Sequence, residues 1–366
     1  MSRFFKEKLK TLEAYTPGEQ PQDKKYIKLN TNESPFAPDE YVVSAAQAAA
    51  AGLNVYNDPE CSRLREEAAA LYNVDKDNIL CGNGSDETLY LAFTAFIEHA
   101  VFPDITYGFY KVFADLTGAD KTIVPLRDEF ELDTGDYADK EGTLIIANPN
   151  AQTGRYIPVC EIEQLIKAGP NRLVIIDEAY IDFGGESCVP LIKKYDNLLV
   201  TQTFSKSRSM AGARLGFAFG SKPLIADMNT VRYSVNPYNV GSVAQAAGIA
   251  AIRHNDIYMQ NCREIIANRE FTEGRLRALG FDTVPSQANF ILARTDKVSG
   301  ERLYIELKKQ GILVRHFSDP KISDYVRITI GTKQQMEALA QAAERIINAW
   351  CGIREKHKRD TDKTCD

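Results

Sequence analysis

Apolar residues along the chain form short unbroken runs that alternate with longer amphipathic stretches. The short runs include NILCG, TLIIANP, RLVIIDE and LLVTQTFS, and their nearly continuous apolar character predicts strands that are buried on both faces of a mainly parallel sheet. The stretches between them, such as SRLREEAAALY, SDETLYLAFTAFI and EIEQLIKAG, carry apolar residues at a three-to-four spacing, which is typical of crossover helices. This alternation predicts an α/β doubly wound core over roughly the first two-thirds of the chain.

The last third of the chain follows a different order. A charged helical pattern runs from about His254 to Leu279 and ends at Gly280, a residue suited to a helix C-terminus. The runs FDTVPS, ANFILAR, GILVRHF and YVRITIG predict strands, and ERLYIELKKQ and KQQMEALAQAAERIINAW predict helices. We therefore expect an N-terminal arm and helix (1–32), a large α/β domain (33–260), a small C-terminal α+β domain that packs with the arm (261–350) and a disordered polar tail (351–366).

Composition and charge favour small-molecule chemistry over binding to nucleic acid or membranes. The chain has 366 residues, 44% of them hydrophobic, and a formal net charge of -6 from interleaved acidic and basic residues, so it has no basic surface for a polyanion. Its opening, MSRFFKEKLKTLEAY, lacks the apolar core of a signal peptide, and no segment is apolar enough to cross a bilayer. Seven scattered cysteines without CxxC pairs predict reduced thiols in a cytoplasmic protein, with no disulfide framework or metal site.

The segment TFSKSRSMAGARLGF carries the first candidate for chemistry. It places Lys206 after a predicted buried strand, at the edge of an open α/β sheet where ligands bind. A lysine whose charge is suppressed by burial or by nearby cations can condense with an aldehyde. Ser205 and Arg214 are suited to hold a phosphate group. An isolated Ser-Lys pair is more often part of a solvated loop, so the hypothesis depends on other residues.

A second candidate stands in LVIIDEAY, where four apolar residues of a predicted strand lead into Asp177 and then Tyr180. An acid at the tip of a buried strand is costly unless it meets a cation. A pyridinium nitrogen would be such a cation, and its protonated ring would act as an electron sink. The alternatives are a helix N-cap or a Walker B strand, but the chain has no GxxxxGK[ST] sequence to accompany the latter.

Two loops complete the set of candidate residues. ILCGNGSDET places Gly84, Ser85 and Asp86 between a predicted strand and a helix, where backbone N–H groups can hold an anion. Such residues also precede many ordinary helices. TLIIANPNAQTG delivers Asn150 into a turn, where its amide could bind a phenolate oxygen or serve only the turn geometry.

Taken in order, GNGSDE, ITYGFY, NPNAQTG, DEAY, SKSRSMAGARLGF and YVRITIG resemble the landmarks of fold-type I pyridoxal-phosphate enzymes, in particular class I and II aminotransferases. The resemblance extends from about Tyr15 to Trp350. It implies a homodimeric enzyme with pyridoxal 5′-phosphate as cofactor. It further implies Lys206 as Schiff-base lysine and general base, Asp177 at the ring nitrogen, Tyr180 and Asn150 at the phenolic oxygen, Tyr107 on the ring face, Gly84, Ser85, Asp86, Ser205 and Arg214 at the phosphate, and Tyr56 at the phosphate of the partner subunit.

The opening YTPGEQP and the following KLNTNESPF resemble one branch of that family, the histidinol-phosphate aminotransferases. This branch implies Tyr15, Asn32, Arg315 and Arg327 as substrate-binding residues. The implied reaction, part of histidine biosynthesis, converts histidinol phosphate and 2-oxoglutarate to imidazole acetol phosphate and glutamate. The chain departs from the family at Ala151 and Gln152, where Asn-Pro is usual. Loss of the proline predicts altered loop stiffness with cofactor binding retained.

Two other activities on the same fold are open at this stage, and a third is disfavoured. Threonine-phosphate decarboxylase also binds a phosphorylated amino compound, and an aromatic amino-acid aminotransferase would share the cofactor residues. A cofactor-binding transcription regulator would need a DNA-binding domain, and the chain has neither spare length nor a basic patch for one.

Overall fold

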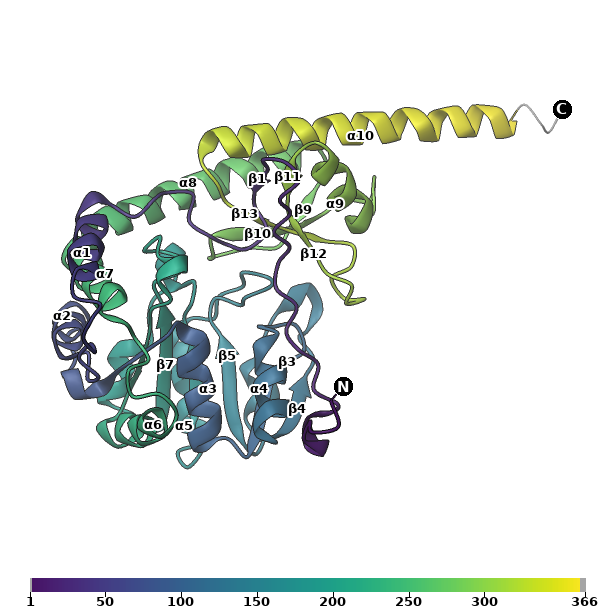
Figure 1. Cartoon of the computed structure of the whole chain (residues 1–366). Helices are drawn as coiled ribbons and strands as arrows, with labels where there is room; N and C mark the ends of the chain where they lie inside the picture. The colour runs from purple at the N-terminus through teal and green to yellow at the C-terminus, as the bar shows by residue number, and fades with distance from the viewer. Residues whose placement is uncertain (1, 363–366) are drawn as a thin grey trace.

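The computed structural model describes residues 2–362, and side chains as far as residue 350. Its centre is a seven-stranded sheet with the order β2-β8-β7-β6-β5-β3-β4 (Figure 1). All neighbouring pairs from β7 to β4 are parallel, whereas β8 is antiparallel to β7 and to β2. The mainly parallel sheet is thus confirmed. The strands are β2 (Ile79–Gly82), β3 (His99–Pro103), β4 (Asp120–Val124), β5 (Thr143–Ala147), β6 (Val174–Asp177), β7 (Leu198–Thr203) and β8 (Gly216–Gly220).

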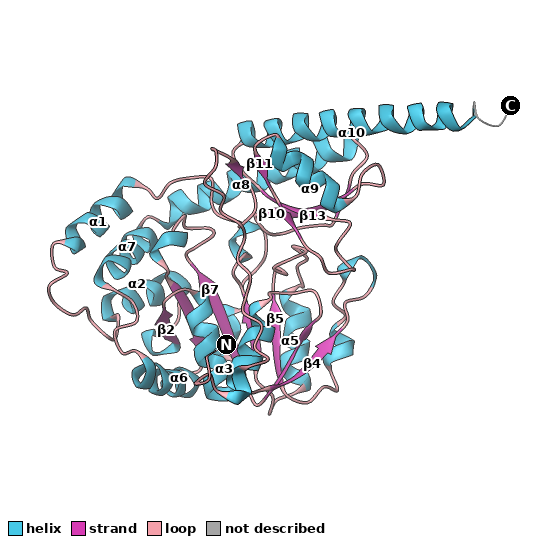
Figure 2. Ribbon diagram, turned by 45° about the vertical axis from the view of Figure 1, so that its right-hand side comes forward, coloured by secondary structure: helices cyan, strands magenta, loops and turns pink. Residues whose placement is uncertain are grey.

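Helices cover both faces of this sheet (Figure 2). Successive residues of the central strands face opposite sides: Ile145 and Ile175 join the hydrophobic cluster that contains α3 and α4, whereas Ile146 and Ile176 join the cluster that contains α2, α5 and α7. Burial on both faces explains why these strands read as unbroken apolar runs. The helices are α1 (Glu40–Ala50), α2 (Ser62–Tyr72), α3 (Ser85–Phe96), α4 (Phe109–Thr117), α5 (Val159–Ala168), α6 (Lys222–Val235) and α7 (Ser242–Arg253).

A smaller α+β unit lies against one end of the large sheet (Figure 1). Helix α8 (Asn255–Ala278) leads into it, and Gly280 has the left-handed φ of +85° expected after a helix end. An antiparallel sheet of order β12-β13-β10-β9 packs with α9 (Gly300–Lys309) and α10 (Lys333–Asp362). Strand β1 (Ile27–Lys28) of the N-terminal arm pairs with β11 (Ile312–Leu313), so the arm is part of this unit. The remaining strands are β9 (Asp282–Thr283), β10 (Phe290–Arg294), β12 (Arg315–His316) and β13 (Val326–Thr329).

The structure differs from the sequence-based prediction at both ends of the chain. The predicted N-terminal helix is reduced to a single 3-10 turn, Glu7–Leu9, which buries no residue and has no side-chain cap, and a short helix without packing is unstable in water. At the other end, α10 continues to Asp362 through residues predicted to be disordered, because adding a turn to an existing helix needs no new nucleus. Residues 1 and 363–366 lie outside the described part. Within residues 2–362, no helix combines the length and apolar character needed to cross a membrane.

Candidate active site

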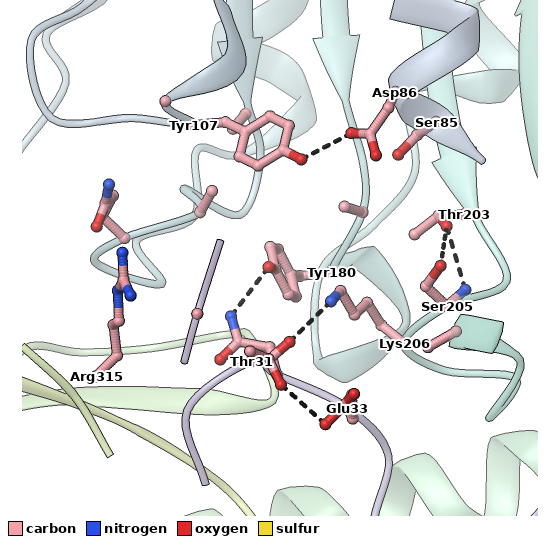
Figure 3. A pocket seen from close by; sticks show the side chains of 18 of the residues that line it. Thr31, Glu33, Ser85, Asp86, Tyr107, Tyr180, Thr203, Ser205, Lys206 and Arg315 are labelled. Atoms are coloured by element: carbon pink, nitrogen blue, oxygen red, sulfur yellow. Dashed lines mark hydrogen bonds between the residues drawn. The ribbon is translucent and has the colours of Figure 1, made fainter. Parts of the chain in front are cut away.

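A cavity of about 450 Å³ opens where the carboxyl ends of β5, β6 and β7 meet the N-terminal arm and the small unit. Parallel strands end at the same edge of a sheet, so the polar residues that follow them converge there. Figure 3 shows Arg315 on the opposite side of this cavity from Ser205 and Lys206, with Tyr180 between them. The predicted residues that line it are Tyr15, Asn32, Ser85, Asp86, Tyr107, Asp177, Tyr180, Ser205, Lys206, Arg214, Arg315 and Arg327.

Lys206 lies three residues beyond the end of β7, and it is only partly exposed. Its Nζ donates a hydrogen bond to the backbone oxygen of Thr31 at 3.1 Å and has no carboxylate partner within the described residues. Burial, assisted by the positive charge of Arg327, lowers the pKa of Lys206 to about 8. The amine is therefore much more often neutral near pH 7 than that of a solvated lysine, as a nucleophile or base requires.

Asp177 is the last residue of β6 and is fully buried. Its carboxylate accepts hydrogen bonds from the hydroxyls of Tyr110 (2.9 Å) and Thr201 (3.2 Å), and it faces the cavity without an ion-pair partner in residues 2–350. Burial raises the pKa of Asp177 to about 6, against the lowering effect of these hydrogen bonds. A cation in the cavity would stabilise this carboxylate. The alternative role as a helix cap is wrong, because the following 3-10 turn has no side-chain cap.

Another part of the cavity wall is shaped by close backbone contacts at the start of α3. A Cβ atom on Gly84, whose φ is +80°, would lie 2.5 Å from Nη2 of Arg214. A Cβ atom on Gly216 would lie 2.6 Å from the backbone nitrogen of Ser85. Glycine at both positions lets a guanidinium group approach free N–H groups at a helix N-terminus, which is a suitable arrangement for a phosphate.

Asp86 connects this phosphate cradle to Tyr107. Its carboxylate accepts hydrogen bonds from the hydroxyl of Tyr107 at 2.7 Å and from Nη2 of Arg214 at 2.9 Å. Such a carboxylate would repel a phosphate, so only the backbone of Asp86 can contact one, and its side chain orients the two neighbours. Ser205 presents a hydroxyl that accepts a hydrogen bond from Thr203 at 3.0 Å, which leaves the Ser205 proton free to be donated.

Tyr180 is held by Asn32. The amide nitrogen of Asn32 donates to the hydroxyl of Tyr180 at 3.0 Å, and its amide oxygen accepts from Thr329 at 3.0 Å. Asn32 is 1% exposed and has a left-handed φ of 56°, a conformation that asparagine tolerates better than most residues. Asn32 therefore holds the Tyr180 hydroxyl in place through this hydrogen bond.

Two arginines form the wall across from Lys206. Arg327 donates to the backbone oxygens of Ala151 (2.8 Å) and Asn30 (3.3 Å). Arg315 donates to backbone oxygens of the N-terminal arm at 3.4 Å. Neither has a carboxylate partner among the residues whose side chains are described, so both remain available to an anion. The ring of Tyr15 lies beside them in the cavity wall.

Three predicted residues do not line the cavity. Gly84 is the N-cap residue of α3 and precedes Ser85, which does line the cavity. Asn150 points elsewhere: its amide nitrogen donates to the backbone oxygen of Ile105 at 2.8 Å, and its amide oxygen accepts the N–H groups of Gln152 and Thr153. Its turn-forming role is the one that the contacts bear out. Tyr56 is 81% exposed and stacks on Tyr238 at 4.4 Å between ring centroids.

Comparison with known proteins agrees with this geometry. The family model described as aminotransferase class I and II matches residues 24–343. The chain belongs to this family. It is 45% identical over 352 residues to the histidinol-phosphate aminotransferase of Brachyspira hyodysenteriae, covering 95% of this chain and 99% of the relative. It also resembles the crystal structure of the histidinol-phosphate aminotransferase from Clostridium acetobutylicum, with a TM-score of 0.82, 25% identity and coverage of 88% and 99%.

The same fold is found in the histidinol-phosphate aminotransferase of Sinorhizobium meliloti, solved in complex with pyridoxal-5′-phosphate, with a TM-score of 0.82, 23% identity and coverage of 89% and 92%. The predicted fold type and activity are confirmed: the protein is a transaminase, and pyridoxal 5′-phosphate is its cofactor. The buried Asp177 and the glycine-flanked cradle fit this group, one at its ring nitrogen and the other at its phosphate.

Proposed function

We propose that this aminotransferase exchanges the amino group between histidinol phosphate and 2-oxoglutarate, a step of histidine biosynthesis. The observation that carries the proposal is the pair Arg315 and Arg327, which face the cavity opposite Lys206 without carboxylate partners in the described residues. Two guanidinium groups can bind a doubly charged phosphate and, in the other half of the cycle, the carboxylate of glutamate. The relative at 45% identity carries the same activity in its name.

When bound, pyridoxal phosphate supplies an electron sink for charge that develops at the substrate α-carbon. Asp177 would hold the proton on the ring nitrogen. Arg214, Ser205 and the N–H groups at the start of α3 would hold the phosphate, and Tyr107 would cover one face of the ring.

Lys206 has two tasks in this proposal. Its neutral amine would bind the cofactor covalently at rest. After release, it would take a proton from the substrate α-carbon and deliver it to the former aldehyde carbon of the cofactor, on the other side of the substrate nitrogen. A pKa of about 8 suits a base that must be neutral before each proton transfer. The hydroxyl of Tyr180, positioned by Asn32, would contact the phenolic oxygen of the cofactor. The hydrogen bond from the amide nitrogen of Asn150 to the backbone oxygen of Ile105 supports Tyr180 as the main partner in this proposal.

The functional unit is proposed to be a cytoplasmic homodimer. Leu53, Val55 and Tyr56 are 65%, 66% and 81% exposed and follow one another in the segment after α1. Neighbouring apolar side chains of this size are expected to be covered by another protein surface. In the dimer, Tyr56 would reach the cofactor phosphate of the partner subunit.

The Tyr56→Phe variant tests this arrangement. Loss of one hydrogen bond to a charged phosphate should weaken cofactor binding about 10- to 100-fold while the dimer persists. Absorbance titration of the apoenzyme would give the Kd, and light scattering the mass. Tyr41→Phe, at a second exposed tyrosine that stacks on His254, is the matched control. A monomeric wild type, or an unchanged Kd in Tyr56→Phe, would contradict the proposed interface.

The substrate is tested by mixing the purified holoenzyme with one amine at a time and recording the cofactor absorption spectrum. Glutamate and histidinol phosphate should each convert the aldehyde form of the cofactor to its amine form. Conversion by phenylalanine in preference to histidinol phosphate would favour an aromatic amino-acid aminotransferase. Release of carbon dioxide from threonine phosphate would favour the decarboxylase.

A further inference from the structure

Gln152 lines the active-site cavity, and only one of the two polar atoms of its side-chain amide has a hydrogen-bond partner among the described residues. Its Nε2 donates to the backbone oxygen of Thr106 at 3.1 Å. Because a carbonyl can only accept, the nitrogen must face Thr106, which fixes the orientation of the amide. The other end, Oε1, is shielded from solvent and has no hydrogen-bond partner among the side chains and backbone that the structure describes.

An unpartnered buried acceptor destabilises a folded protein, and most such groups have partners in native structures. The proline that is usual in the family at this position would have no amide oxygen to satisfy. The backbone supports the glutamine as well, because its N–H donates to Oδ1 of Asn150 at 2.9 Å, a hydrogen bond that proline cannot form. Gln152 is thus held by its backbone N–H and by Nε2, while Oε1 accepts no hydrogen bond from the described residues. This arrangement suits a ligand that donates a hydrogen bond.

The surroundings of Gln152 indicate which part of a ligand it would meet. The preceding residue, Ala151, holds Arg327 through its backbone oxygen at 2.8 Å, so Gln152 lies next to the arginine wall. Tyr15 lines the same cavity, its ring centroid 6.2 Å from that of Tyr107, and it offers apolar surface to a flat ring. A phosphorylated substrate anchored on the arginines would therefore carry its second, aromatic arm toward this wall.

We propose that Gln152 determines specificity for an imidazole ring, with Oε1 accepting the ring N–H of the substrate. The inference rests on the proposed function and adds to it the group that recognises the ring. A neutral imidazole has one N–H donor, whereas a phenyl ring has none, and an amide oxygen discriminates between them. The terminal torsion of glutamine is broad, so a small rotation that keeps the Nε2–Thr106 hydrogen bond would direct Oε1 at the ring N–H.

The test is a cycle of two enzymes and two substrates. Wild type and Gln152→Met are compared in kcat/KM for histidinol phosphate and for phenylalaninol phosphate, which has the same phosphate and amine but no ring N–H. The variant should lose about tenfold or more with histidinol phosphate and change less than about twofold with phenylalaninol phosphate. The loss should reside mainly in KM. Gln287→Met is the matched control, because Oε1 of Gln287 is also buried without a partner but lies outside the cavity.

Equal losses on both substrates, or no loss on either, would overturn the inference. The half-reaction with glutamate, which has no ring, reports whether the variant is folded and loaded with cofactor, and a variant that fails there as well counts against a specific role. A wild type that fails with histidinol phosphate but reacts with glutamate would instead refute the proposed function, so the two failures are distinguishable.

Discussion

Lys206→Ala is expected to lower the rate of amino transfer by at least about 10⁴-fold, because one substitution removes both the covalent attachment of the cofactor and the base that moves the proton. The phosphate cradle at Arg214 and Ser205 is separate from this amine, so the variant should still bind cofactor. Single-turnover absorbance with glutamate would give the rate. Borohydride treatment followed by mass spectrometry would show a cofactor adduct on wild type only.

Lys194→Ala is the control for this substitution. Lys194 is an exposed lysine that pairs with Glu163 on the surface, and its loss should change neither rate nor adduct. A reducible adduct that persists in Lys206→Ala would show that another lysine binds the cofactor. Added methylamine, a small free base, should restore part of the lost rate if Lys206 acts as a base.

The strands of the large sheet were predictable because their environment is uniform. The runs around Ile145 and Ile175 are apolar on both sides, as burial between two layers of helices requires, and they are too short for buried helices. Strand β8, Gly216–Gly220, is the informative contrast: it alternates glycine or alanine with phenylalanine and is antiparallel to its neighbours. Its place depends on the close approach of Gly216 to the start of α3, a long-range contact that no local pattern encodes.

The residues of the candidate site also fall into two groups: those that local sequence patterns predict and those that depend on tertiary contacts. Asp177 and Lys206 follow predicted strands, and the sheet edge brings such residues together. Tyr110 was not predicted, because a tyrosine inside an amphipathic helix is typical of a core residue, and only the tertiary structure aims its hydroxyl at Asp177. For Asn150 the sequence was equally compatible with a cofactor contact and with a role in the turn. The direction of its side chain depends on the backbone oxygen of Ile105, a tertiary contact that supports the role in the turn.

Asp177→Asn is expected to reduce kcat about 10²- to 10⁴-fold while cofactor binding changes far less. Removing one member of a buried ion pair typically costs about 3–5 kcal/mol, and each 1.36 kcal/mol of barrier is a factor of ten in rate. The amide has the shape of the carboxylate and can keep a hydrogen bond from Tyr110 or Thr201. It cannot hold the ring nitrogen in its protonated state, so charge at the α-carbon loses its sink.

The neighbouring Glu178 provides a demanding control because it is equally buried and also acidic. Its carboxylate points away from the cavity and accepts hydrogen bonds from Ser187, the backbone N–H of Cys188 and Gln202, and burial raises the pKa of Glu178 to about 7. Glu178→Gln should therefore lower the melting temperature and leave kcat within about twofold. Asp177→Asn should instead lower kcat and change the melting temperature little, because the charge that it removes faces the cavity and not the core. If both variants lost activity in proportion to their loss of stability, Asp177 would be a structural acid, and the role at the ring nitrogen would be wrong.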